Sequence, residues 1–173
     1  MNRPEAARDV PPAERLGAAI HMLCRGAAFG GGAVLIAIMA LTVVSVVLRE
    51  VNGRPIPGDF ELVEMGCAIA MFAFLPYCQW VGGNVAVEFV TARAPGWLRG
   101  GLDATASAAY AAIAVLITWR LTLGGLDLQR YQETTMVLGV PVWWAFVPIV
   151  PSVALLALTA AYTAWRSLSQ APR

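Results

Sequence analysis

The chain has 173 residues, of which 58% are hydrophobic and 13% are charged, and its formal net charge is +1 at pH 7. An ordinary soluble domain carries about 25% charged residues, so this composition predicts a protein that lies in a membrane. All twelve basic residues are arginine. The nearly balanced charge gives no reason to expect a nucleic-acid partner.

Four uncharged, mostly apolar runs fill most of the chain, at residues 26–48, 65–87, 104–119 and 134–165. A helix of about 20 residues crosses the roughly 30 Å hydrocarbon core of a bilayer, so each run predicts one span. The third run is short, but Arg120 beyond it can place its guanidinium among the headgroups. In the fourth run, Gly139 and Pro141 mark the start of the helix. Tryptophans, which favour the membrane interface, lie near the predicted helix ends at Trp80, Trp97, Trp119, Trp143 and Trp165.

These runs define the expected organisation of the chain. We expect spans at about residues 24–48, 61–81, 100–123 and 141–165, within one membrane domain at residues 16–168. Residues 1–15 are expected to form a mobile amino-terminal tail, and residues 169–173 a short carboxyl-terminal one. The first run contains 23 uncharged residues, more than the roughly 7–15 of a signal-peptide core, so we interpret it as a retained span.

The arginines predict the orientation. Four spans put both termini on one side of the membrane. The two tails and the loop between the second and third spans hold eight arginines, against four in the other two loops. Positive charge is enriched on the cytoplasmic side. The predicted fold is therefore an all-α membrane protein with four transmembrane helices, short interfacial helices and both termini in the cytoplasm.

The interfacial helices are expected at two places. Residues 16–25 carry leucine and isoleucine between Arg15 and Arg25, which predicts either a short interfacial helix or an extension of the first span. Residues 82–103 form the longest connection, with an apolar side that also predicts an interfacial helix. In the first span, Gly26 and Gly30 form a GxxxG motif, which lets two helix backbones approach closely but also arises by chance in a span rich in small residues.

Few residues suit catalysis. His21 is the only histidine, so one chain cannot supply the two axial ligands of a haem held in a helical bundle, and we expect this side chain at headgroup level. Cys24, Cys67 and Cys78 form no CxxC pair, and no metal-ligand spacing occurs. We therefore expect no enzyme, no catalytic or cofactor-binding residue and no metal site.

Two carboxylates mark the start of the second span. Glu61 and Glu64 are three residues apart, so they share one helical face near the positive end of the helix dipole. They either mark the headgroup boundary or pair with a cation, and Arg49, Arg54 or a basic residue of another subunit are the expected partners. No deeper acidic residue continues a path for ions.

The order of several motifs resembles a known family. Gly53-Arg54-Pro55-Ile56 precedes the second span, Glu61 begins it, and Gly82-Gly83-Asn84-Val85-Ala86-Val87-Glu88 follows it. Leu138-Gly139-Val140-Pro141-Val142-Trp143-Trp144, then Pro148 and Pro151, lead into the fourth. Over about residues 16–168 the chain resembles the small membrane subunit of tripartite ATP-independent periplasmic (TRAP) transporters, the DctQ-like family. That family usually has a histidine and an aspartate where Asn84 and Glu88 stand.

The resemblance implies a multi-pass protein of the bacterial inner membrane. It also implies a scaffold for a larger, DctM-like permease subunit, which takes up an organic acid with sodium after delivery by a periplasmic solute-binding protein. Membrane lipids are the remaining partners. The expected structural or subunit-contact residues are Arg49, Glu61, Glu64, Asn84, Glu88, Pro141, Trp143 and Trp144. The alternative is a self-sufficient, homo-oligomeric small channel or transporter.

Overall fold

The computed structural model describes residues 12–81 and 96–169. Within these ranges the chain forms four α-helices: α1 (Pro12–Asn52), α2 (Asp59–Trp80), α4 (Gly96–Tyr131) and α5 (Trp143–Ser169). Each of these four helices is long and apolar enough to cross a membrane. The prediction of an all-helical protein with four membrane-spanning helices is therefore confirmed for the described part of the chain.

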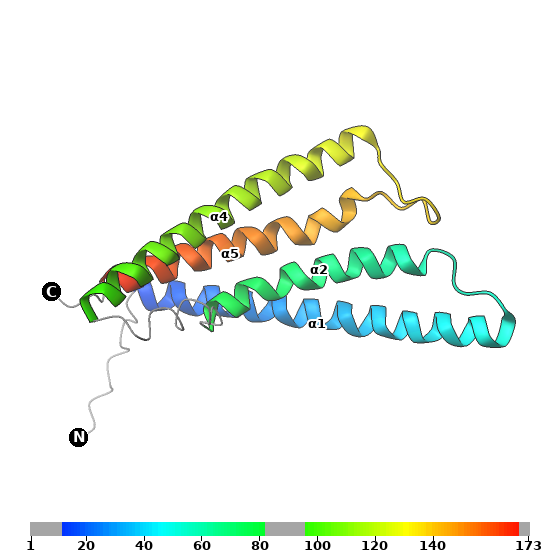
Figure 1. The fold of residues 1–173 in the computed structure, drawn as a ribbon, viewed down its shortest axis with the longest axis horizontal. Coiled ribbons are helices and arrows are strands. Elements are labelled where there is room, and N and C mark those ends of the chain that lie inside the picture. The colour runs from blue at the N-terminus through cyan, green and yellow to red at the C-terminus, as the bar shows by residue number, and fades with distance from the viewer. Residues whose placement is uncertain (1–11, 82–95, 170–173) are drawn as a thin grey trace, which may run out of the picture.

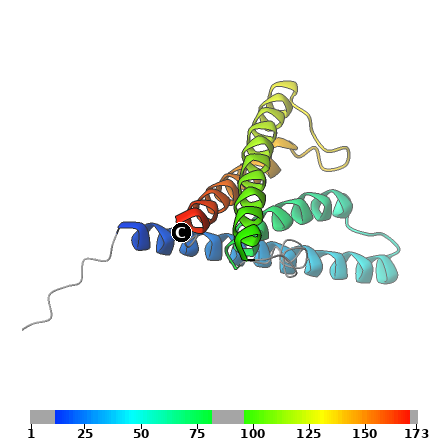
Figure 2. The ribbon, with the colours of Figure 1, turned by 60° about the vertical axis from the view of Figure 1, so that its left-hand side comes forward.

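The helices form two antiparallel hairpins, α1 with α2 and α4 with α5 (Figure 1). Helices α2 and α5 pack against each other and join the hairpins, so α1 and α4 lie on the outside. One end of the bundle holds the connections at residues 53–58 and 132–142; we call it the loop end. The start of α1 and the end of α5 lie at the opposite end, the terminal end. The second view shows the α4–α5 hairpin inclined to α1 and α2 (Figure 2).

Helix α5 supplies most of the core. Its buried side chains recur every three or four residues, as expected for one face of a helix. Ala145, Ile149 and Val153 pack against partly buried residues of α2 and α4, and Leu156 and Ala157 form a second cluster with Ala114 of α4. Because lipid tails are as apolar as leucine, this packing depends on close van der Waals contact between the helices.

Helices α1 and α2 approach each other at two glycines. A Cβ atom on Gly31 would lie 2.9 Å from the Cβ of Ala73 and 3.3 Å from the backbone oxygen of Ala70. On Gly66 it would lie 2.5 Å from Cγ2 of Ile38. Gly26 and Gly30 of the GxxxG motif, by contrast, have nothing within 4 Å of such an atom. Of the two alternatives for the GxxxG motif, the described residues therefore show no close approach of helices at these two glycines.

The helices are longer than expected. Helix α1 begins at Pro12, inside the segment predicted as a tail, and continues unbroken through residues 16–25. Proline suits the first position of a helix because its missing N–H would have no partner there. The proposed interfacial segment at 16–25 is thus the extension of the first span. Helix α4 begins at Gly96 and reaches Tyr131, eight residues beyond the expected end at 123.

Part of the interfacial helix that was expected at residues 82–103 is helical, but it is continuous with α4. Residues 96–103 belong to the first turns of α4 rather than to an independent interfacial helix. The rest of that prediction, at residues 82–95, lies outside the described residues, and so do Asn84 and Glu88. The cytoplasmic placement of both termini stays a prediction.

Candidate subunit-contact site

Glu61 connects the two hairpins at the loop end. It lies in the first turn of α2, and its carboxylate accepts hydrogen bonds from the backbone N–H groups of Val137 (2.8 Å) and Leu138 (3.0 Å). Both donors lie in the connection between α4 and α5. Hydrogen bonds to an ionised carboxylate are shorter and stronger than those between neutral groups. One side chain of the first hairpin therefore holds the loop of the second.

The loop that Glu61 holds has a regular internal structure. Thr134 and Pro141 form an antiparallel bridge. The N–H of Thr135 donates to the carbonyl of Val140 at 2.9 Å, and the N–H of Val140 donates to the Thr135 hydroxyl at 3.1 Å. Gly139 closes the turn with a positive φ of 65°, which glycine adopts without steric cost. We call residues 133–142 the α4–α5 loop hairpin.

Gly58 provides the second contact with the loop hairpin. It precedes α2 with φ 77°, and a Cβ atom here would overlap the side chain of Leu138. A residue with a side chain would therefore be strained in this backbone conformation and would also collide with Leu138. The glycine lets the loop hairpin lie directly against the start of α2.

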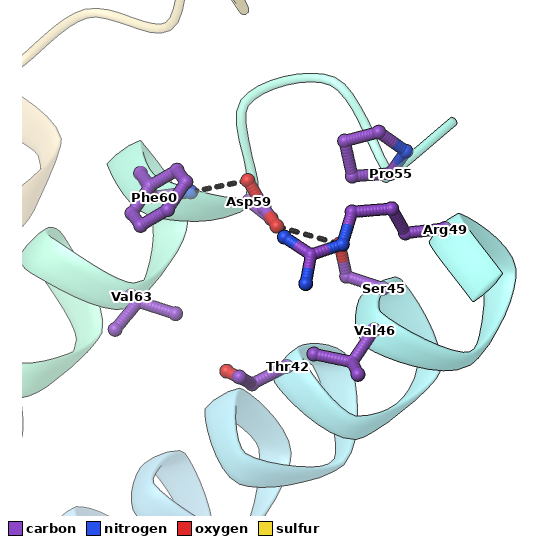
Figure 3. A pocket seen from close by; sticks show the side chains of 8 residues that line it. All are labelled: Thr42, Ser45, Val46, Arg49, Pro55, Asp59, Phe60 and Val63. Atoms are coloured by element: carbon purple, nitrogen blue, oxygen red, sulfur yellow. Dashed lines mark hydrogen bonds between the residues drawn. The ribbon is translucent and has the colours of Figure 1, made fainter. Parts of the chain in front are cut away.

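A buried serine connects the end of α1 to the start of α2. The hydroxyl of Ser45, which is 2% exposed, donates to Oδ2 of Asp59 at 2.5 Å, and the N–H of Ile56 donates to the same hydroxyl oxygen at 3.2 Å. The other carboxylate oxygen, Oδ1, accepts from the N–H of Phe60 at 2.9 Å (Figure 3). These bonds satisfy polar groups that would be costly to bury unpaired, and they fix the turn at residues 53–58.

The structure brings together only some of the expected site residues. Among the described residues, Glu61 forms no ion pair with Arg49 or Arg54, and its carboxylate accepts hydrogen bonds from amides of the loop hairpin instead. A basic partner from another subunit stays a prediction. Arg49 lies within 4.0 Å of Glu50 on an exposed face, and Glu64 is also exposed. The donors come from a loop that is distant in the sequence, so the residue pattern of α2 alone could not predict them.

The remaining expected residues surround the loop hairpin. Pro141 forms its bridge with Thr134. Trp143 and Trp144 open α5, with their rings in an edge-to-face arrangement at 6.3 Å between centroids. Trp144 is 56% exposed, as expected for an aromatic ring at the membrane interface. Ser45, Gly58 and Asp59 were not expected. Gly58 and Asp59 could have been found from the sequence, because a glycine and an aspartate at the end of a turn often precede a helix. Nothing in the sequence around Ser45 indicates its role.

The terminal end is held by a separate layer of aromatic and polar side chains. The His21 ring lies 5.6 Å from that of Trp80, which in turn lies 5.9 Å from that of Tyr162. The amide of Gln79 donates to the Thr163 hydroxyl at 3.3 Å. His21 is half-buried against Trp80. These contacts join α1, α2 and α5, and among the described residues no group of three or more His, Cys, Asp or Glu is placed to hold a metal.

Comparison with known proteins identifies the family of the chain. A family model described as "Tripartite ATP-independent periplasmic transporters, DctQ component" matches residues 38–170. This range includes part of α1 and all of α2, α4 and α5. Searches of curated proteins and of solved structures found no match. Because the family model covers well over half of the chain, the protein belongs to the DctQ family, the small permease subunits of TRAP transporters.

Proposed function

We propose that this subunit is a noncatalytic scaffold that holds a larger, DctM-like permease subunit in the bacterial inner membrane. In this proposal the complex takes up an organic acid with sodium, after a periplasmic solute-binding protein delivers it. Membership of the DctQ family supports the transporter assignment. The sodium, the substrate class and both partners are inferred from the resemblance to that family.

The observation that carries the scaffold role is the distribution of polar and apolar groups. The buried polar side chains of the described residues are Ser45, Gln79 and Thr159, and each makes a hydrogen bond within the chain. A substrate site needs several convergent polar groups that are free to bind a ligand. In the described interior, the side chains pack against one another and these polar groups are already paired.

The outer helices support the same role. Large apolar side chains cover the exposed faces of α1 and α4, including Ile36 and Met39 of α1 and Leu116 and Trp119 of α4. In the membrane such faces meet either lipid or the helices of another subunit. A chain with two long apolar faces and a small core is suited to anchoring a partner.

We further propose that the loop hairpin is one of the contacts with the rest of the transporter. Glu61 and Gly58 hold its backbone, while Met136 is 100% exposed and Val137 is 62% exposed. An ordered loop that presents apolar side chains to the outside is typical of an interaction surface. Pro141, Trp143 and Trp144 would act by fixing the start of α5 beside it.

Copurification tests the scaffold role. The chain, tagged and extracted from its native membrane in mild detergent, is expected to bring down one stoichiometric protein with many more spans, identified by mass spectrometry. Membranes that hold the untagged chain serve as the control for nonspecific capture. Recovery of a homo-oligomer alone would favour the channel alternative.

Reconstitution tests the noncatalytic role. Liposomes that contain this chain alone are expected to take up no organic acid in a sodium gradient, because the buried polar side chains of the described spans already form hydrogen bonds within the chain. Liposomes with the copurified large subunit and its binding protein are expected to show uptake. Flux of an organic acid through the isolated chain would contradict the proposal.

A further inference from the structure

A pocket opens between the last turns of α1 and the first turn of α2, at the loop end. Its volume is about 180 Å³. Figure 3 shows Arg49 and Asp59 at its upper rim, and Val46, Phe60 and Val63 around it. The surface of the pocket is therefore almost entirely apolar, with two ionic side chains at its rim.

The apolar wall faces outward. Phe60 is 85% exposed and Val46 is 46% exposed, although both belong to helices that are apolar enough to span a membrane. Exposed apolar side chains next to a pocket at the end of a span provide a surface for an acyl chain. The pocket thus lies where a headgroup and its hydrocarbon tail would both find contacts.

Among the described residues, the ionic rim has one cation, Arg49, with N–H donors that bind no other group. Arg49 lies in the last turn of α1 with its side chain 60% exposed, and its ion pair with Glu50 is at 4.0 Å, the outer limit for such a contact. A guanidinium has five N–H donors in a planar fork that fits phosphate oxygens. At the same rim, the carboxylate of Asp59 is oriented by the hydroxyl of Ser45 and by the N–H of Phe60.

The charged residues around the pocket favour a headgroup without net negative charge. Residues 49–64 contain four carboxylates and two arginines, so a lipid with net negative charge would meet an unfavourable field. A zwitterionic headgroup can pair its phosphate with Arg49 and its cation with Asp59. The primary ammonium of ethanolamine donates hydrogen bonds to a carboxylate, whereas the quaternary ammonium of choline has no N–H to donate.

We propose that this pocket binds phosphatidylethanolamine, with the phosphate at Arg49, the ammonium at Asp59 and one acyl chain over Val46 and Phe60. The proposal requires that the chain lies in a membrane, and it is independent of any particular transported substrate. A bound lipid here would stabilise the α1–α2 hairpin next to the residues that hold the loop hairpin.

Native mass spectrometry of the purified chain with added lipids tests the site. Phosphatidylethanolamine, phosphatidylcholine and phosphatidylglycerol with identical acyl chains are compared as probes. The ethanolamine lipid is expected to remain bound about tenfold more strongly than the choline lipid, the effect of roughly one charge-assisted hydrogen bond. Arg49→Gln is expected to weaken its binding about tenfold. Arg54→Gln, the matched control, removes the same charge from the loop outside the pocket and should have little effect.

Two further variants keep the test decisive if Arg49→Gln alters the fold. Asp59→Asn keeps the side-chain shape and should abolish the preference for ethanolamine over choline. Phe60→Ala should weaken all three lipids similarly. Equal binding of the ethanolamine and choline lipids, or stronger binding of phosphatidylglycerol, would overturn the proposal. So would a Phe60→Cys variant that crosslinks to a copurifying subunit in native membranes, since a protein would then cover the pocket.

Discussion

Gly31→Leu is expected to force α1 away from α2 and to destabilise the bundle. The Cβ of the new side chain would already lie 2.9 Å from Ala73 and 3.3 Å from the backbone of Ala70. Neither neighbour can move aside, because one is a methyl group on a helix and the other is the helix backbone. Overpacking of this kind costs about 1–3 kcal/mol, and occasionally more. Thermal unfolding in detergent, followed by size-exclusion chromatography of a fluorescent fusion, measures the loss.

The neighbouring glycine is a matched control. Gly30→Leu makes the same chemical change one residue earlier in α1, where nothing lies within 4 Å of the added Cβ. Leucine has a better helix propensity than glycine, so this variant should be at least as stable as the original chain. If both variants lost the same stability, the close approach of α1 and α2 at Gly31 would be disproved.

Glu61→Ala is expected to release the loop hairpin from α2. The amide groups of Val137 and Leu138 lose the carboxylate that accepts their hydrogen bonds. Hydrogen exchange followed by mass spectrometry should then show that these two amides exchange about tenfold faster, as local opening becomes easier. The same variant should reduce recovery of the large subunit in the copurification experiment, because the loop hairpin is one of its proposed contacts.

Glu64→Ala is the control for this prediction. It removes the same charge from the same helix, at an exposed position one turn further along α2. Its effect on exchange of the loop hairpin should be small. Glu61→Gln keeps one acceptor oxygen and should lie between the two. Equal protection of Val137 and Leu138 in all variants would show that Glu61 does not hold the loop hairpin in solution.

The number and type of the helices could be predicted from the sequence because both follow from local properties. An uncharged run of about 20 residues is long enough to cross the hydrocarbon core whatever its neighbours are. Tryptophan near the ends of such runs, as at Trp80 and Trp143, reflects the preference of one side chain for the interface. The family resemblance was also local, since it depended on short motifs in a fixed order, and the family model confirms it.

The ends of the helices were less predictable from the same information. Helix α4 continues to Tyr131, past the predicted end of the span at residue 123, because a helix can extend beyond an apolar run. Beyond residue 123 the helix carries Asp127 and Arg130, which are exposed. An apolar run therefore predicts where a helix meets lipid, and it does not predict where the helix ends.

The sequence by itself determined the class of the protein, its four helices and the positions of its candidate carboxylates. Only the tertiary structure decided which groups those helices bring together. Glu61 lies 76 residues from Val137, and the glycine that packs α1 against α2 is Gly31 rather than the more conspicuous pair at Gly26 and Gly30. The physical reason is that the rotation of each helix about its axis is set by packing against the others, and a pattern within one helix contains no information about its partner.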